Sequence, residues 1–301
     1  MSALAEPAGG VLVQGITGRQ ASWSVREMAR YGTHIVAGVV PGRGGMEHEG
    51  VPVYDLTADA VRATGATTAI TFVPGPAAGE AMVEAVEAGI RLIVCPGDGI
   101  PIADALRVRR AARTAGAVLV GPNTPGVIMP GCWKLGFMPS DLYIPGPLGV
   151  ISKSGSLSYE VCWRLTQAGI GQSTVMGIGG DPIKGTVVLD ALRLFDADPD
   201  TAAVLVLGEI GGFDEYQVLD RSRGDAAKPV GVFLVGRTAP RGRRLGHAGA
   251  LIGSARETFN AKAEALRQAG VPLADTLEDV IPMVRRLLDQ AAREDGGGDD
   301  V

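Results

Sequence analysis

The sequence has few cysteines and few aromatic residues. Its 301 residues include three cysteines, Cys95, Cys132 and Cys162, and aromatic residues make up 5% of the chain. Because the number of cysteines is odd and no two of them have metal-ligand spacing, we expect neither a disulfide framework nor a metal site. We expect the protein to reside in a reducing compartment. So few aromatic side chains disfavour a surface on which single-stranded nucleic acid could stack.

Long basic and long apolar stretches are also missing. The net charge is −5 without a long basic run, which argues against a nucleic-acid partner. No apolar stretch approaches the roughly 20 residues that a membrane helix needs, so we expect no membrane partner. Residues 1–10 contain no Lys or Arg and no apolar segment, unlike a secretory signal or transit peptide. These features predict a cytoplasmic protein.

What the sequence does have is glycine, 44 residues of it, and a regular alternation of short β-branched runs with helical patterns. Such alternation predicts βαβ units with a parallel sheet, and the length suggests two domains. In the first half we expect strands at 11–14, 34–40, 68–73, 92–95 and 118–120, and helices at 22–31, 79–88 and 102–115. This half, residues 1–122, is expected to be a Rossmann-like α/β domain.

The alternation stops at residues 121–147, which contain six prolines. We therefore expect a connector without regular structure at 123–147. A second doubly wound, flavodoxin-like α/β domain is predicted at 148–291, and a disordered acidic tail at 292–301. The expected strands of this second domain are 148–151, 173–176, 203–207 and 230–235, and its expected helices are 156–168, 186–195 and 257–269.

A first candidate site follows the first strand. Gly15-Ile-Thr-Gly18 precedes a helix, whose N-terminus favours phosphate, although the spacing is G-x-x-G rather than G-x-G-x-x-G. The strand at 34–40 has no acidic residue after it until Glu47, whereas an NAD site requires one for the ribose. Arg43 in a glycine loop suits a ribose phosphate, which favours NADP or coenzyme A over NAD. The alternatives are a tight turn and a surface loop with a solvated arginine.

A second candidate site centres on His247, within Gly246-His-Ala-Gly-Ala250 and just after Arg241, Arg243 and Arg244. Ser154-Gly155-Ser156 opens a helix after a strand and offers hydroxyls and backbone N–H groups to an anion. Glu209 follows another strand, at the sheet edge where α/β sites assemble. Together they suggest a nucleophilic histidine, an orienting carboxylate and an anion-binding helix start. The alternative is a histidine that caps a turn.

Seven motifs occur in an order that resembles one family. They are Gln14-Gly-Ile-Thr-Gly18, Pro41-Gly-Arg-Gly-Gly45, Gly121-Pro-Asn-Thr-Pro-Gly126, Ser152-Lys-Ser-Gly-Ser-Leu-Ser-Tyr-Glu160, Gly177-Ile-Gly-Gly-Asp-Pro182, Gly208-Glu-Ile-Gly-Gly212 and Gly246-His-Ala-Gly-Ala250. Over roughly residues 8–290 the chain resembles the α subunits of succinyl-CoA synthetase (succinate–CoA ligase), including those of malate–CoA ligase.

The resemblance implies a role for each motif. The N-terminal domain would bind coenzyme A, His247 would be a phosphohistidine with Glu209 as its partner, and Tyr159 would lie at the acid-substrate site. Ser154, Gly155 and Ser156 would hold the phosphoryl group. The implied coenzyme A contacts are Thr17, Gly18, Arg19, Gln20, Arg43, Pro96, Gly97 and Asp98. The sequence departs from the family at Arg43, where lysine is usual, and at residues 19–24 and 95–98.

The resemblance also implies a partner, because the family's ATP or GTP site, with Mg, lies on an ATP-grasp β subunit for which this chain has no room. The assembly would be αβ or α2β2, and the reaction would join a small dicarboxylate to coenzyme A, as in the tricarboxylic acid cycle. Malate or another dicarboxylate is an alternative to succinate. The competing functions are a non-catalytic coenzyme A-binding or redox-sensing module and an NADP oxidoreductase.

Overall fold

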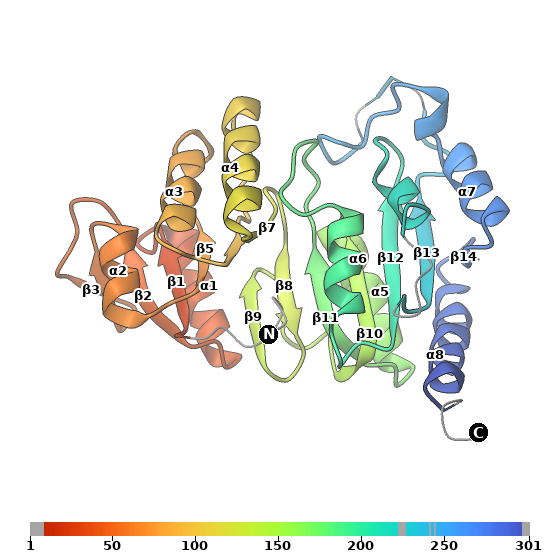
Figure 1. Ribbon diagram of the computed structural model, residues 1–301, viewed down its shortest axis with the longest axis horizontal. Coiled ribbons are helices and arrows are strands. Elements are labelled where there is room, and N and C mark those ends of the chain that lie inside the picture. Colours follow the sequence, from red (N-terminus) through yellow and green to blue (C-terminus); the bar gives the residue numbers. More distant parts are fainter. Residues whose placement is uncertain (1–8, 222–226, 241, 244, 297–301) are drawn as a thin grey trace. The chain divides into compact units, whose positions relative to one another are not determined.

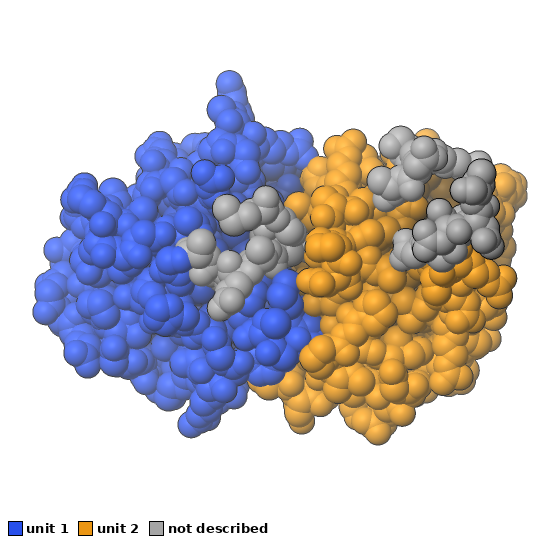
Figure 2. All heavy atoms as spheres, turned by 60° about the horizontal axis from the view of Figure 1, so that its bottom comes forward, with its two compact units in different colours: residues 1, 3–138, 183–186 blue, residues 2, 139–182, 187–301 orange. Residues whose placement is uncertain are grey.

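The computed structural model describes residues 9–221, 227–240, 242–243 and 245–296 (Figure 1). Apart from the first two residues, the chain divides into unit 1, of residues 3–138 and 183–186, and unit 2, of residues 139–182 and 187–301 (Figure 2). Among the described residues, no helix combines the length and the apolar character that crossing a membrane requires.

Unit 1 contains a seven-stranded sheet in the order β3-β4-β2-β1-β5-β6-β7, parallel except for the short β3–β4 pair. Because β1 is central, with β2 on one side and β5 on the other, this is the Rossmann-like arrangement that the sequence predicts. The elements are β1 (Val11–Gln14), α1 (Arg19–Arg30), β2 (Ile35–Val39), β3 (Glu47–His48), β4 (Val51–Tyr54), α2 (Thr57–Thr64), β5 (Thr68–Thr71), α3 (Gly75–Glu87), β6 (Leu92–Val94), α4 (Ile102–Ala115) and β7 (Val118–Val120).

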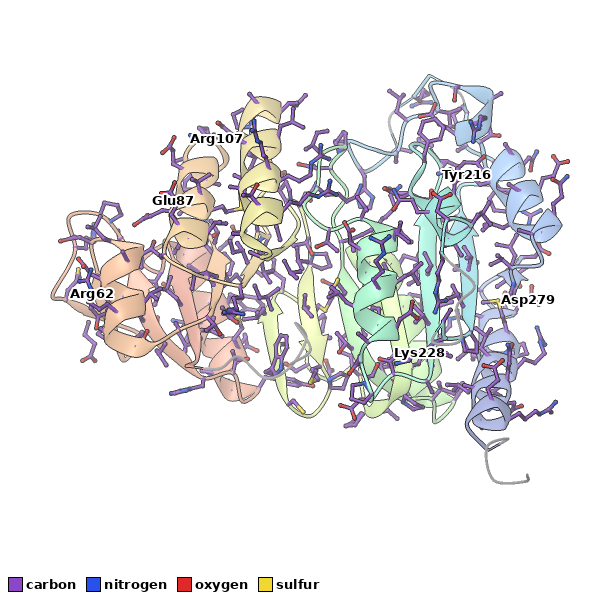
Figure 3. The ribbon with its side chains drawn as sticks, in the orientation of Figure 1. Arg62, Glu87, Arg107, Tyr216, Lys228 and Asp279 are labelled. Carbon is purple, nitrogen blue, oxygen red and sulfur yellow. The ribbon has the colours of Figure 1, made fainter. Side chains whose placement is uncertain are left out.

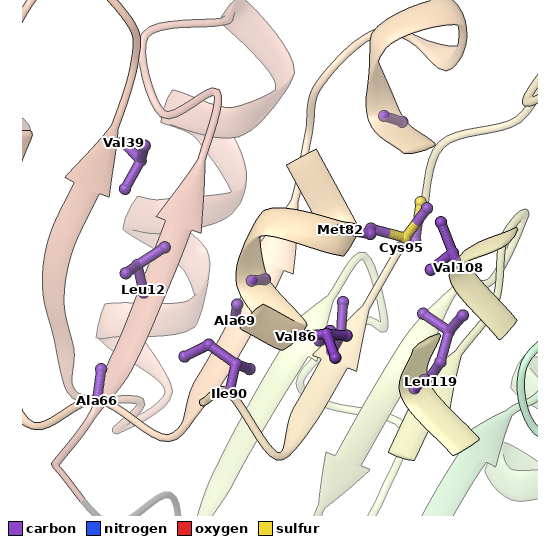
Figure 4. Close-up of a cluster of buried hydrophobic side chains, with 14 of the residues drawn as sticks. Leu12, Val39, Ala66, Ala69, Met82, Val86, Ile90, Cys95, Val108 and Leu119 are labelled. Atoms are coloured by element: carbon purple, nitrogen blue, oxygen red, sulfur yellow. The ribbon is translucent and has the colours of Figure 1, made fainter. Parts of the chain in front are cut away.

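The core of unit 1 explains why its strands are short, continuous apolar runs. All four residues of β1 and of β5 are buried, as expected for parallel strands that are covered on both faces. Leu12 from β1 shares a buried cluster with Met82 of α3 and Val108 of α4 (Figure 4). Burying aliphatic side chains of this size contributes about 1.5–3 kcal/mol each.

Unit 2 contains five parallel strands in the order β14-β13-β12-β10-β11. Helices α5 and α8 contact each other, whereas α6, η1 and α7 form a second connected group, so helices cover both faces of the sheet. This confirms the predicted doubly wound α/β class. The elements are β10 (Pro145–Ser152), α5 (Gly155–Gln167), β11 (Gln172–Gly177), α6 (Val188–Asp196), β12 (Ala203–Glu209), η1 (Asp214–Val218), β13 (Val230–Val235), η2 (Ala255–Glu257), α7 (Phe259–Gln268), β14 (Leu273–Ala274) and α8 (Val280–Gly296).

The expectation that residues 123–147 lack regular structure is wrong. They contain the antiparallel hairpin of β8 (Gly126–Met129) and β9 (Trp133–Gly136), and β10 begins at Pro145. The hairpin is fixed to α1, because Ser24 Oγ donates to the carbonyl oxygen of Gly136 over 3.2 Å. Most of the prolines flank or begin these strands, whereas Pro147 lies within β10 where its pairing with β11 shifts register between Pro145 and Leu148. Strand ends and bulges are the places where strands tolerate proline.

The predicted disordered tail at 292–301 is wrong for its first half. Helix α8 continues through residue 296, and residues 297–301 lie outside the described part of the chain. Val284, Leu287 and Ala291 are buried at helical spacing, so the apolar face extends to the last turns. Exposed Gln290 donates to Glu294 over 2.9 Å, one helical turn later.

Candidate functional site

His247 and Glu209 meet in unit 2. Strand β12 ends at Glu209, and Nδ1 of His247 lies 2.8 Å from Glu209 Oε2. The His247 side chain is 26% exposed and that of Glu209 9%, so the imidazole is accessible while its partner is buried. Since an ionised carboxylate only accepts hydrogen bonds, Nδ1 carries the proton. The lone pair of the neutral imidazole is then on Nε2, where it can act as a nucleophile.

Glycine residues allow the loops around His247 to lie close to one another and to the imidazole ring. A Cβ atom on Gly180 would lie 2.7 Å from His247 Cγ, so any larger residue there would displace the ring. The backbone N–H of Gly249 donates to the carbonyl oxygen of Gly180 over 3.0 Å. Gly211 has a φ of +82°, and its Cβ would lie 2.3 Å from the oxygen of Gly249. Three loops thus converge on the ring through residues without side chains.

The environment of His247 raises the pKa of its imidazole above the ordinary value of 6.5. The hydrogen bond to Glu209 is the largest cause, and the negative charges of Glu209 and Asp181 act in the same direction. Partial burial and the positive charge of Lys153 oppose it. The site therefore favours the protonated ring more than water does.

A buried network of charges lies behind the Glu209 carboxylate. Lys153 Nζ lies 3.7 Å from Glu209 Oε1, 3.5 Å from Asp214 Oδ2 and 3.3 Å from Glu215 Oε1. Lys262 Nζ pairs with Glu215 Oε2 and donates to the carbonyl oxygens of Glu209 and Gly211 over 2.8 and 2.7 Å. Both lysines and Glu215 are at most 4% exposed.

Sequence reasoning missed this network. Lys153 stands in the motif that begins at Ser152, directly after a strand, and that position was the available signal. Glu215 and Lys262 are 47 residues apart and carry no motif that connects them. Arg243 is exposed, and Arg241 and Arg244 lie outside the described residues.

The predicted anion-binding helix start is the first turn of α5. Ser154 is its N-cap, and its side chain accepts from Leu157 N at 3.4 Å. Ser154 Oγ lies 3.5 Å from Ser156 Oγ, and Ser156 is exposed. Because Ser152 on β10 is opposite Leu207 on β12, α5 begins at the sheet edge from which Glu209 extends. Tyr159 follows on α5, half-buried, and burial raises the pKa of its hydroxyl.

In unit 1 the loop between β1 and α1 has the form expected of a ligand-binding turn. Gly15 has a φ of +76°, and its Cβ would lie 3.1 Å from the carbonyl carbon of Phe72, which follows β5. Gly18 is the N-cap of α1 and uses no side chain to cap it. Thr17 is half-buried, whereas Arg19 and Gln20 are exposed. This is the point between β1 and β5 where such sheets bind ligands.

The remaining predicted coenzyme A contacts follow β2 and β6, at the same edge of the sheet in unit 1. Arg43 is exposed, and the backbone N–H of Gly44 beside it donates to Asp55 Oδ1 over 2.8 Å. Pro96 and Gly97 are half-buried and Asp98 is exposed. Within the described residues, no three His, Cys, Asp or Glu side chains form a group that could hold a metal ion.

Two protein-family models match the chain. Residues 7–98 match the CoA binding domain, and residues 151–272 match CoA-ligase. A coenzyme A-binding domain is thus present in unit 1, and the matched ligase region includes Lys153, Glu209 and His247.

Relatives match over nearly the whole length. Succinate–CoA ligase [ADP-forming] subunit alpha 1 of Archaeoglobus fulgidus is 49% identical over 93% of this chain and 96% of its own. Malate–CoA ligase subunit alpha of Methylorubrum extorquens is 48% identical over 91% of this chain and 94% of its own. The ATP citrate lyase of Methanothrix soehngenii, solved with citrate and coenzyme A, is 26% identical with a TM-score of 0.86. The match covers 97% of this chain, which spans about half (52%) of the lyase chain.

These matches confirm the family that the ordered motifs predict. Identity near one half over more than nine-tenths of both chains includes both α/β units and the loop that carries His247. The chain belongs to the succinate–CoA ligase α-subunit family of acid–thiol ligases, in which the malate–CoA ligase α subunit is a close relative.

Proposed function

We propose that this chain is the phosphohistidine-bearing α subunit of an NTP-dependent dicarboxylate–CoA ligase. The observation that carries the proposal is the 2.8 Å contact of His247 Nδ1 with the buried Glu209 carboxylate. It leaves Nε2 available on a half-exposed ring, in a region that matches CoA-ligase. Neither a coenzyme A-binding module nor an NADP oxidoreductase needs such a pair.

The reaction has three transfers. His247 Nε2 attacks the γ-phosphorus of the nucleotide and the diphosphate leaves, while Glu209 stabilises the positive charge that develops on the ring. A substrate carboxylate oxygen then takes the phosphoryl group, which forms an acyl phosphate and frees the imidazole. Finally the coenzyme A thiolate attacks the acyl carbon and phosphate leaves. Splitting one difficult step into three lowers each barrier.

The start of α5 is proposed to hold the phosphoryl group. The first backbone N–H groups of a helix have no partner within the helix, and its dipole favours an anion. Ser154 and Ser156 add hydroxyl groups at this end, and Gly155 lets the anion approach closely. Tyr159, one turn later, is proposed to contact the acid substrate.

The nucleotide and its Mg are proposed to bind a β subunit of the ATP-grasp class, in an αβ or α2β2 assembly. The relatives are α subunits, which supports a partner, and the A. fulgidus relative is an ADP-forming ligase, which supports ADP as product. The acid is proposed to be succinate, with malate as the second candidate because of the M. extorquens relative.

The complex itself gives the test. The chain, purified together with its β subunit, is incubated with coenzyme A, ATP or GTP, and a panel of carboxylic acids, and thioester formation is measured. Succinyl-CoA or malyl-CoA formed together with nucleoside diphosphate supports the proposal. If the complex forms no thioester with any dicarboxylate, the proposed activity is wrong.

Coenzyme A binding through Arg43 is testable on the chain alone. Arg43 can donate two N–H groups to the 3′-phosphate, which dephospho-coenzyme A lacks. Coenzyme A is therefore expected to bind more tightly than dephospho-coenzyme A by a factor of about 10 or more. Arg43→Ala should remove that difference. Calorimetric titration measures both affinities, and NADPH serves as the competing ligand.

The matched control is Arg107→Ala, because Arg107 is a half-exposed arginine on α4 of the same unit (Figure 3). It pairs with Glu80. The Arg107→Ala variant should keep the preference for coenzyme A. Tight NADPH binding without heat from coenzyme A would overturn both the cofactor assignment and the ligase proposal.

The phosphorylation rate should depend on pH in a direction that His247 sets. Only the neutral imidazole is a nucleophile, and Glu209 raises the imidazole pKa above its ordinary value of 6.5. The initial rate should therefore fall as the pH drops through a midpoint above that of a free histidine. In Glu209→Gln the midpoint should move to lower pH, because the charge that raises it is gone. A midpoint that stays in place would exclude the ion pair as its cause.

A further inference from the structure

The second oxygen of the Glu209 carboxylate is not explained by His247. Oε2 holds the imidazole, but Oε1 is buried and has no hydrogen-bond partner among the described residues. A buried carboxylate oxygen without a hydrogen bond carries a desolvation cost unless a nearby positive charge compensates for it. The positive charge that faces Oε1 is Lys153 Nζ, at 3.7 Å.

Lys153 is built into the fold as a fixed cation. Its side chain is 4% exposed, yet it faces three carboxylates, of Glu209, Asp214 and Glu215, within 3.3–3.7 Å. Burial lowers the pKa of Lys153, but the negative charges of Glu215, Asp214 and Glu209 outweigh it and raise the pKa to about 12. The ammonium group is thus charged throughout the physiological range.

A second lysine, Lys262, helps to keep Glu215 ionised. Burial raises the pKa of Glu215, but Lys153 and Lys262 outweigh it, so that the pKa lies below its ordinary value. Glu215 Oε1 also accepts from the backbone N–H of Glu209 at 3.1 Å. Lys262 contacts Glu215 and backbone oxygens but not the Glu209 carboxylate. The network therefore gives its two lysines different positions relative to Glu209.

We propose that Lys153 is a positioning residue that keeps the Glu209 carboxylate turned toward His247 Nδ1, so that Nε2 is the nitrogen that accepts the phosphoryl group. This inference rests on the function proposed above. Lys153 acts through Glu209 and contacts neither the reacting nitrogen nor, on this view, the phosphoryl group.

The arrangement has two consequences for His247. An ionised, fixed Glu209 keeps the proton on Nδ1 and stabilises the ring as it gains positive charge. The charge of Lys153 also limits how far Glu209 and Asp181 raise the imidazole pKa, which keeps more of the ring in its neutral form. Removal of Lys153 takes away that smaller opposing charge but also releases Glu209, whose hydrogen bond is the largest cause of the raised pKa, so it should slow the reaction and move its pH dependence downward. Removal of Glu209 is expected to move it downward.

The first test uses the isolated full-length chain and needs no ligase activity. The sequence has three histidines, so an NMR titration of ring-labelled histidine gives few signals, and His247→Ala assigns that of His247. In Lys153→Met the His247 midpoint should fall by about half a pH unit or more, because Glu209 is no longer held against Nδ1. Lys153→Gln should shift it in the same direction, and Lys153→Arg should leave it near the wild-type value.

Lys262→Met is the matched control, because Lys262 is equally buried in the same network without contacting the Glu209 carboxylate. It should shift the His247 midpoint by less than half as much. An unchanged or higher midpoint in both Lys153→Met and Lys153→Gln would overturn the proposal, because a rise means that Lys153 acts only through its own charge. An equal shift in Lys262→Met would overturn it as well.

The second test measures phosphoryl transfer in the complex with the β subunit and labelled ATP. In Lys153→Met the rate of label incorporation at pH 7 should be lower by a factor of about 10 or more, with the midpoint of the pH profile at lower pH, and Lys153→Arg should recover most of the rate. A rate within about threefold of wild type with an unchanged midpoint would overturn the positioning role. If the wild-type chain takes up no label, the proposed function fails, whereas the NMR titration still tests the coupling.

Discussion

Replacement of His247 by alanine is expected to abolish phosphoryl incorporation into this chain. With the β subunit and labelled ATP, wild type should acquire an acid-labile, base-stable label, as a phosphoramidate does, and His247→Ala should acquire none. The reason is chemical: the half-exposed imidazole, held at Nδ1 by Glu209, provides the nucleophile at Nε2, and alanine provides none.

The control is another histidine variant. His34 is exposed and directly precedes β2 in unit 1, so His34→Ala should be labelled like wild type. Mass spectrometry of the intact chain under alkaline conditions measures the added phosphoryl group. Label that persists in His247→Ala would remove this residue from the proposed role.

Replacement of Glu209 by glutamine should give the second-largest effect. The change keeps the size of the side chain but removes the charge that stabilises the imidazolium and selects the Nδ1–H tautomer. A glutamine amide can also donate to Nδ1, which would leave the proton on the wrong nitrogen. The rate of phosphorylation should fall roughly 10²–10⁴-fold, as is typical when one member of such a unit is removed.

A variant that loses a negative charge elsewhere in unit 2 separates the specific effect of Glu209 from the effect of a changed net charge. Glu264 is exposed on α7, where it accepts from Gln268 over 3.1 Å, so Glu264→Gln should react at the wild-type rate. Rapid-quench measurement of label in both variants makes the comparison. A Glu209→Gln rate within about threefold of wild type, which is under about 1 kcal/mol of barrier, contradicts the role.

Much of the fold follows from local sequence. Strands β1, β7 and β13 and helix α4 have the bounds that their apolar runs and flanking residues predict. A continuous four-residue run such as Val11–Gln14 is typical of a parallel strand that helices cover on both faces, and this is the environment that the strand has. Helix α2 was missed because only Thr57 and Ala60 are buried along its eight residues, which leaves almost no periodic signal.

The candidate site was also partly predictable from local sequence. Parallel strands place their carboxyl ends at one edge, so a residue that ends β12 and one that follows β10 were expected near each other. Glu209 and the start of α5 are at that edge. The glycines around His247 marked a loop that could approach another backbone, and Gly180 and Gly249 do so.

The sequence by itself thus determined the α/β class and the ordered motifs of the family, and it suggested the pairing of a histidine with a strand-end carboxylate. The tertiary structure alone decided which atom of His247 faces Glu209, and that Lys153, Glu215 and Lys262 form a buried network behind it. The physical reason is that strand and helix periods are local, whereas an ion pair joins residues distant in sequence. Only folding brings Lys153 and Glu209 within 3.7 Å, and only burial makes that separation important for the charge of the carboxylate.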